Sequence, residues 1–326
     1  MTKVIGIGNA IVDVIARAED TFLEHMGIEK GIMQLIDRPR AELLYAAMEN
    51  RVETPGGSVA NTIAGLGKLG LEAAFIGKVK ADALGRGYAE GMQADGIAFP
   101  NPPVEGADAP TSRSMIFVSP DGERSMNTYL GAGADLGAGD VAEAAFSDGG
   151  FVFLEGYLFD KDEGKTAFRR AAQLMHDAGG QAGITLSDPF CTDRHRADFQ
   201  QLIAGEMDVT IGNEAEWTTL YETDLDTALD KAASACRTVV CTRSGDAVLV
   251  IQDGKRVEIP VETVVPVDAT GAGDQFAAGF LYGYTTGRDM ETSGRMGVAA
   301  AAEVIGHVGP RPETDMGVRF KELGLL

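Results

Sequence analysis

The sequence predicts an α/β fold, in which helices cover both faces of a doubly wound, mostly parallel sheet, giving three layers and a small β-sheet lid. Short apolar runs alternate with helical stretches through most of the 326 residues. Continuous apolar strands between helices are typical of parallel sheets buried on both faces. Residues 97–130 break this rhythm because they lack a helical pattern. We expect one domain spanning residues 1–326.

The N-terminal part begins with an apolar strand at residues 3–8, KVIGIG. A helix at 58–69, a strand at 73–77 and a helix at 85–95 are expected to follow it. The alternation is more regular beyond residue 150. The strands expected there are 151–156, 183–187, 209–212 and 238–242, and the helices are 165–178, 196–205, 214–221 and 226–236.

The lid is predicted from two β-rich runs at 113–119 (RSMIFVS) and 124–129 (RSMNTY), which flank a Pro-Asp-Gly turn. Proline and glycine in this order favour a tight turn, so the two runs predict a β-hairpin. Together with the segments near 10–16 and 30–37, the hairpin would form a small sheet that projects from the main domain.

Composition limits the partners. Lysine and arginine number 28 against 49 aspartates and glutamates, a formal charge of −21. Such a surface repels nucleic acid and anionic membranes, so we expect neither as a partner. The three cysteines are an odd number without a signal-peptide pattern, which favours reduced thiols and a cytoplasmic protein. The uncharged stretch at 275–287 is too short to cross a bilayer.

One glycine pattern is misleading. Residues 65–70 (GLGKLG) match the dinucleotide pattern G-x-G-x-x-G, which would suggest a dehydrogenase. That pattern must follow a strand and open a helix, whereas here it closes a helix and leads into a strand. We interpret it as a helix end.

A more informative segment is TPGGSVAN at 54–61, which opens a helix. Gly56 and Gly57 allow the backbone to approach a ligand closely, with the amides of the helix N-terminus facing it. Asn61 lies one turn into the helix and could reach back toward that ligand. The alternative is a plain glycine turn with Ser58 as the N-cap residue.

The second segment is DATGAGD at 268–274, followed by an apolar helix. Gly271, Ala272 and Gly273 would supply consecutive free N–H groups at a positive helix end, which can hold the charge of a transferring phosphoryl group. Asp274 in the first turn can accept the proton of an attacking hydroxyl. The alternative is that Asp274 only complements the helix dipole, which leaves the glycines unexplained.

These two segments resemble the signature regions of the ribokinase-like, or phosphofructokinase B, family of sugar and nucleoside kinases. The likeness extends from Ile5 to Pro310. It implies a single α/β domain with a β-sheet lid, and transfer of the γ-phosphoryl group of ATP to an alcohol. Asp274 matches the family's catalytic base. Its anion hole is matched by Gly271, Ala272 and Gly273. The substrate-binding positions are matched by Asn9, Asp13, Gly56, Gly57 and Asn61.

The resemblance also implies an ATP site. Asn213 and Glu216 match an N-x-x-E motif associated with ATP phosphates and Mg²⁺, with Glu216 reaching the metal through water. Without the family, Glu216 could be an ordinary exposed glutamate. Thr242, Arg243 and Gly245 resemble a nucleotide-binding strand end, although Ser244 replaces a glycine of the family pattern. A monovalent cation such as K⁺ near Asp268 is a further possibility that related kinases suggest.

The segment LSDPF at 186–190 resembles adenosine kinases, in which the phenylalanine stacks on the purine. Phe190 could instead only pack the strand end. Thr270 stands where adenosine kinases often have asparagine. We expect phosphorylation of the adenosine 5′-OH to AMP; the alternatives are a sugar kinase acting on ribose, fructose or ketodeoxygluconate, and a catalytically silent nucleoside-binding protein. We expect a monomer or a homodimer.

Overall fold

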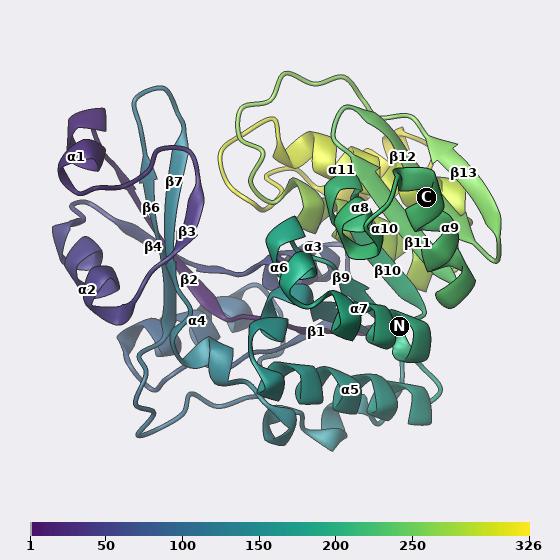
Figure 1. The fold of residues 1–326 in the computed structure, drawn as a ribbon, viewed down its shortest axis with the longest axis horizontal. Helices are drawn as coiled ribbons and strands as arrows, with labels where there is room; N and C mark the ends of the chain where they lie inside the picture. The colour runs from purple at the N-terminus through teal and green to yellow at the C-terminus, as the bar shows by residue number, and fades with distance from the viewer. Residues whose placement is uncertain (1) are drawn as a thin grey trace.

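The computed structural model describes residues 2–326, and its larger sheet has eight strands in the order β13-β12-β11-β10-β9-β8-β1-β5 (Figure 1). The strands from β5 to β11 in this order pair in parallel, and β12 and β13 add an antiparallel edge. The mostly parallel sheet is therefore confirmed. The bounds are β1 (Lys3–Ile7), β5 (Glu72–Ile76), β8 (Phe151–Glu155), β9 (Gln181–Thr185), β10 (Val209–Asn213), β11 (Thr238–Arg243), β12 (Asp246–Gln252) and β13 (Lys255–Ile259).

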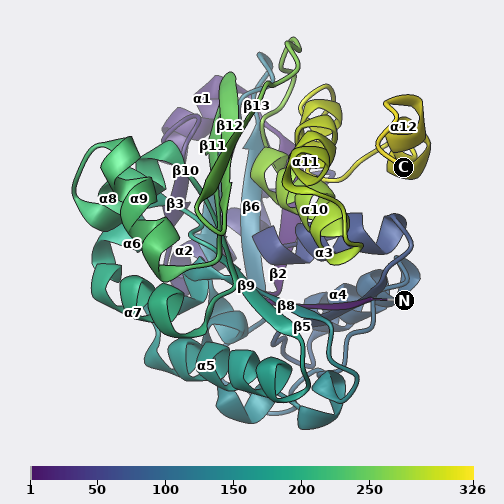
Figure 2. The same cartoon turned by 90° about the vertical axis from the view of Figure 1, so that its right-hand side faces the viewer.

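Helices cover both faces of this sheet, which confirms the three layers (Figure 2). One face carries α3 (Ser58–Lys68), α10 (Ala272–Thr285) and α11 (Met290–Val304), and the other carries α5 (Asp162–Asp177), α7 (Arg196–Glu206), α8 (Glu214–Tyr221) and α9 (Leu225–Ala235). The remaining helices are α1 (Asp20–His25), α2 (Arg38–Ala47), α4 (Ala83–Ala94), α6 (Pro189–Arg194) and α12 (Met316–Glu322), with 3₁₀ helices at Gly131–Asp135, Ala138–Asp140, Glu143–Phe146 and Gly156–Asp160. Within residues 2–326, no helix combines the length and the apolar character needed to cross a bilayer.

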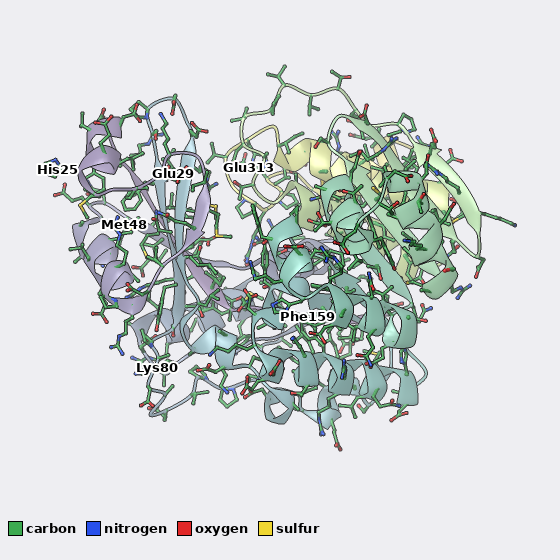
Figure 3. The ribbon with its side chains drawn as sticks, in the orientation of Figure 1. His25, Glu29, Met48, Lys80, Phe159 and Glu313 are labelled. Carbon is green, nitrogen blue, oxygen red and sulfur yellow. The ribbon has the colours of Figure 1, made fainter. Side chains whose placement is uncertain are left out.

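Aromatic packing fixes the layer formed by α5 and α7. The ring of Phe159 lies 5.6 Å from that of Phe168 and 4.3 Å from that of Phe199, centroid to centroid, in the interior of the domain (Figure 3). Buried aromatic clusters of this kind contribute strongly to core stability. On the opposite face, Gly279 of α10 lets α11 approach, since a Cβ there would lie 2.4 Å from the Met296 carbonyl oxygen.

The smaller sheet, with α1 and α2, forms the lid. Its strand order is β3-β7-β6-β2-β4, with bounds β3 (Met33–Leu35), β7 (Arg124–Tyr129), β6 (Ser112–Val118), β2 (Ile11–Arg17) and β4 (Val52–Gly56). The segments expected to form the lid contain β2, β3, β6 and β7. We did not expect β4, whose Pro55 disfavours a strand; as an edge strand it tolerates proline, which donates no ladder hydrogen bond.

Alternation along the lid strands gives the sheet two different faces. Val12 and Phe117 point into the core beneath α1 and α2, whereas Asp13 and Thr128 point toward a cavity between the lid and the main domain. This follows from the two-residue period of a strand. Figure 3 labels Met48 on the helical side of the lid, away from the main domain.

Candidate active site

A cavity of about 500 Å³ lies between the lid and the carboxyl edge of the main sheet. It collects residues from β2, β3 and β7 of the lid, from the N-termini of α3 and α10, and from the end of β8 and the start of α6. The predicted site residues that line it are Asn9, Asp13, Gly57, Asn61, Phe190, Gly271, Ala272, Gly273 and Asp274. Gly56 and the predicted ATP-binding residues are not part of this lining.

Gly56 and Gly57 are required by close approaches. A Cβ on Gly56 would lie 2.4 Å from Asp13 Oδ2, and one on Gly57 would lie 2.3 Å from the Asn9 carbonyl oxygen. Gly57 also has a φ of 103°, a conformation that favours glycine. The N-cap residue of α3 is Gly57, so the interpretation of Ser58 as the N-cap was wrong.

Asp274 is held by side chains of α3. Its Oδ1 accepts a hydrogen bond from Ser58 Oγ at 2.6 Å and its Oδ2 accepts one from Asn61 Nδ2 at 3.1 Å. Burial raises the pKa of Asp274 to about 6, although these donors and the Arg311 charge oppose the rise. A carboxylate with a pKa close to the working pH is suited to accept a proton. Complementing the helix dipole would not require this clamp.

The backbone before Asp274 offers donors to the cavity. Gly271 is the N-cap residue of α10 with a φ of 79°, and a Cβ on it would lie 2.5 Å from Pro310 Cα. The Ala272 N–H already donates to the Ala269 carbonyl at 3.2 Å, so the expectation of consecutive free N–H groups was wrong for this residue. The Gly271 and Gly273 N–H groups have no acceptor among residues 2–326 and stay available to an anion.

Two hydrogen-bond acceptors of the N-terminal segment face the cavity. Asn9 Nδ2 donates to Glu155 Oε1 at 2.8 Å, which leaves Asn9 Oδ1 to accept from a ligand. Asp13 is buried, and its carboxylate accepts no hydrogen bond from residues 2–326. Burial raises its pKa to about 6, with the Arg124 charge as the largest opposing influence. Two acceptors together suit the hydroxyl groups of a polyol.

The sequence reasoning missed Glu155, the last residue of β8. Its Oε1 accepts from the Asn9 N–H at 3.1 Å and its Oε2 from the Val59 N–H at 3.1 Å, which joins β1 to the start of α3. A Cβ on Gly8 would lie 2.4 Å from this carboxylate, so Gly8 makes room for it. Burial raises the pKa of Glu155 to about 7. The only signal in the sequence was a charged residue ending an apolar strand.

An ion pair joins the lid to the loop that precedes α10. Arg124 Nη1 of β7 lies 2.7 Å from Asp268 Oδ2, and the two side chains are 6% and 7% exposed. Asp268 also accepts from the N–H groups of Thr270 and Gly309. Burial alone would raise the pKa of Asp268, but these donors outweigh it and lower the pKa. Arg124 Nε and Nη2 are buried without a hydrogen-bond partner in residues 2–326.

Exposed apolar side chains also line this cavity. Phe190 in the first turn of α6 is 78% exposed, so the alternative that it packs the strand end was wrong. Met33 and Leu35 of β3 are 44% and 52% exposed and line the same cavity from the lid. Exposed apolar side chains around one cavity mark a surface that a ligand can cover.

Asn213 and Glu216 form a capping box at the start of α8. Glu216 Oε2 accepts from the Asn213 N–H at 2.8 Å, and Oε1 accepts from Asn213 Nδ2 at 2.7 Å. Glu216 is buried, which raises its pKa to about 7, so the alternative of an exposed glutamate was wrong. Direct coordination of a metal by Glu216 would compete with this cap, whereas a contact through water need not.

The other predicted ATP-binding residues lie next to this box. Asn213 pairs with Thr242 across β10 and β11, Arg243 is the last residue of β11, and Gly245 lies in the turn to β12. Ser244 has a φ of 50°, which explains why a glycine is favoured at this position. No group of three or more metal-ligating side chains occurs in the described part of the chain. A Mg²⁺ ion bound here would need to take most of its ligands from nucleotide phosphates and water.

The pfkB family of carbohydrate kinases matches residues 1–315 of the chain. The fold is similar to that of an adenosine kinase from Sinorhizobium meliloti, with a TM-score of 0.90, 45% identity and 99% of each chain covered. It is also similar to a probable sugar kinase protein from Rhizobium etli CFN 42, with a TM-score of 0.91, 43% identity and 100% of each chain covered. An adenosine kinase from Dictyostelium discoideum is 26% identical over 342 residues, covering 98% of this chain and 99% of that protein.

Proposed function

The chain belongs to the pfkB family of carbohydrate and nucleoside kinases, which confirms the family that the two glycine segments predicted, and on this basis we propose that it phosphorylates the 5′-OH of adenosine. It is an ATP-dependent kinase, and kinases of this family generally use ATP with Mg²⁺. The observation that carries the kinase chemistry is the carboxylate of Asp274, clamped by α3 at the N-terminus of α10 inside the cavity. The choice of adenosine depends on the exposed ring of Phe190 in the same cavity.

In the proposed reaction, the substrate hydroxyl transfers its proton to Asp274 while its oxygen forms a bond to the γ-phosphorus. The bond from that phosphorus to the β,γ-bridging oxygen breaks, and ADP leaves. The free N–H groups of Gly271 and Gly273 are placed to stabilise the negative charge of the transferring group. Mg²⁺ bound with ATP, which Glu216 would hold through water, would neutralise part of the phosphate charge.

The presence of both polar acceptors and an exposed aromatic ring in the cavity supports a nucleoside as the substrate. Asn9 and Asp13 offer acceptors for the ribose hydroxyls, and the exposed ring of Phe190 offers a stacking surface for a base. Stacking of a base on an aromatic side chain contributes about 1–3 kcal/mol. A free pentose has no flat apolar face for Phe190 and the lid residues Met33 and Leu35 to cover.

The second candidate is a sugar kinase. The acceptors Asn9 and Asp13 would serve any polyol, and the similar protein from Rhizobium etli CFN 42 is named a probable sugar kinase. This candidate uses the same base and anion-binding N–H groups, so it differs only in what covers the apolar end of the cavity.

A coupled ADP-release assay with adenosine, ribose, fructose and ketodeoxygluconate separates the two. We expect kcat/KM for adenosine to exceed that for free ribose by about 10- to 100-fold, since stacking alone accounts for about 1–3 kcal/mol. Chromatography should identify AMP as the product. Preference for a sugar would contradict the nucleoside assignment and leave the kinase intact. Binding of adenosine without ADP release from any substrate would favour a silent binding protein.

A further inference from the structure

A segment near the C-terminus packs against the loop that carries the proposed anion-binding N–H groups. The N–H of Gly309 donates to Asp268 Oδ2 at 3.0 Å, and the carbonyl of Pro310 accepts from Gln275 Nε2 at 3.0 Å. Figure 3 labels Glu313 in the same segment. These two hydrogen bonds anchor Gly309 and Pro310, so the backbone of the next residue, Arg311, is fixed in place.

Arg311 uses its whole guanidinium group to join three other elements. Its Nε donates to Asn61 Oδ1 of α3 at 3.2 Å, and its Nη2 donates to the Pro55 carbonyl of β4 at 2.8 Å. Its Nη1 forms an ion pair with Asp95, the C-cap residue of α4. The side chain is only 18% exposed.

The contact between Arg311 and Asn61 determines which way the amide of Asn61 faces. Arginine only donates hydrogen bonds, so the amide oxygen must turn toward Arg311. The amide nitrogen then points the other way, where it donates to Asp274 Oδ2 at 3.1 Å. The reversed amide would place its oxygen against a carboxylate oxygen, and neither atom could donate.

We propose that Arg311 is a positioning residue of the phosphoryl transfer, which fixes the Asn61 amide so that it holds the Asp274 carboxylate toward the attacking hydroxyl. The inference rests on the proposed function because it takes Asp274 as the base. Arg311 acts through Asn61, and no contact between Arg311 and the reacting atoms is required.

Charge supports the same role. The Arg311 guanidinium opposes the rise in the pKa of both Asp274 and Asp13 that burial causes. Arg124 of β7 also lowers the pKa of Asp13, whereas the charge of Asp274 raises it. The Asp274 carboxylate in turn raises the pKa of Glu155 of β8 and of Tyr157 in the 3₁₀ helix after it, and Asp13 raises that of Tyr88 of α4. Since the base must be ionised to accept a proton, loss of the positive charge should raise its pKa and move the acid limb of the activity to higher pH.

The test compares Arg311→Met with Arg311→Lys in the full chain, with pH profiles of kcat and kcat/KM for the best substrate. We expect Arg311→Met to lower kcat on the order of 10- to 100-fold, since a small misplacement of a catalytic group costs this much. Its acid limb should move to higher pH. Arg311→Lys keeps the positive charge but lacks the planar guanidinium group. We therefore expect it to keep the acid limb of the wild-type pH profile and to restore only part of the kcat that Arg311→Met loses.

Two controls separate positioning from general stabilisation. Asp95→Asn removes the ionic partner of Arg311 but leaves its bond to Asn61, so it should lower the melting temperature without moving the acid limb. Arg319→Met removes another C-terminal arginine, which pairs with Glu262 on the surface at 2.8 Å, and should leave kcat at the wild-type value. If Asp95→Asn reproduces the profile of Arg311→Met, the role is structural and the inference is overturned.

A double-mutant cycle with Asn61→Ala decides whether Arg311 acts through Asn61. The two losses should not add, because the arginine has nothing left to orient once the amide is gone. Additive losses, or wild-type kcat and acid limb in Arg311→Met, would overturn the inference and leave the proposed function standing. If Arg311→Met does not fold, the cycle with Arg311→Lys decides the same question by the same criterion. Full activity of Asp274→Asn would instead overturn the base, and so the proposed function.

Discussion

The two ends of the cavity are built on different principles. At the phosphoryl end every polar side chain that we assign a role in catalysis has a protein partner: Asp274 is held by Ser58 and Asn61, and Asn61 is held by Arg311. The other end, called the lid end here, is lined by Phe190 of α6 together with Met33 and Leu35 of the lid strand β3, and the ring of Phe190 is 78% exposed. Preorganised dipoles stabilise a transition state without reorganising, whereas apolar contact is nondirectional and gains its energy only when a ligand covers it.

This contrast indicates where each property of the enzyme resides. Substitutions at the phosphoryl end should change the chemical step for every substrate. Substitutions at the lid end should change which substrate is preferred and leave the step itself intact. The lid is nevertheless tied to the phosphoryl end by the ion pair between Arg124 and Asp268.

The largest effect is expected for Asp274→Asn, which removes the base but keeps the shape of the side chain. We expect kcat to fall by about 10²- to 10⁴-fold for every substrate, the usual contribution of general acid–base catalysis. Folding and ATP binding should persist, measured by circular dichroism and calorimetry. Asp226→Asn removes another first-turn aspartate, on α9, and should keep full activity. Equal losses in both variants would mean that Asp274 only complements the helix dipole.

A smaller loss is expected for Asp13→Ala, between the two ends. Hydrogen bonds to a charged group contribute about 1.5–3 kcal/mol, so kcat/KM should fall by roughly 10- to 150-fold. The loss should appear with adenosine and with sugars alike, because Asp13 is assigned to hydroxyl groups that both contain. Asp20→Ala is the control, since Asp20 pairs with Lys30 on the lid surface. Wild-type kcat/KM in Asp13→Ala would remove the residue from the substrate site.

Phe190→Ala tests the lid end by itself. We expect KM for adenosine to rise about tenfold, within the range for loss of one stacked base, while kcat is retained. Kinetics with free ribose should be unchanged. The melting temperature should also be unchanged, because the ring is mostly exposed. Phe190→Tyr keeps a stacking surface and should restore the KM. An equal effect on ribose would show that the ring does not contact a base.

The smallest effect is expected when the pH is lowered and kcat/KM of the wild-type enzyme is measured. Burial raises the pKa of Asp274, and that of Asp13, to about 6. Both must be ionised for the proposed roles, so kcat/KM should be full above this pH and fall as the pH drops through about 6. A profile of kcat/KM between pH 5 and 8, with a pH-insensitive coupling system, measures it. A flat profile down to pH 5 would show that neither carboxyl limits activity.

Much of the architecture could be predicted from local patterns. The expected helix at 214–221 agrees with α8 at both ends, and the expected hairpin agrees with β6 and β7 within one residue. Such elements depend on periodicity and turn residues within a short window, which the sequence displays directly. The strands β4, β12 and β13 were not predicted. Pro55 made β4 look unlike a strand, and the predicted alternation of strands and helices was not continued past residue 242.

The residues proposed to carry the chemistry could be identified from the chain alone, because glycines that permit close approach and an aspartate at a helix N-terminus form local patterns. How these residues are held could be learned only from the folded molecule. Ser58 donates to Asp274 across 216 positions of sequence, and Arg311 reaches Asn61 across 250. Such partners are set by the packing of whole elements against one another, which no local pattern of residues records.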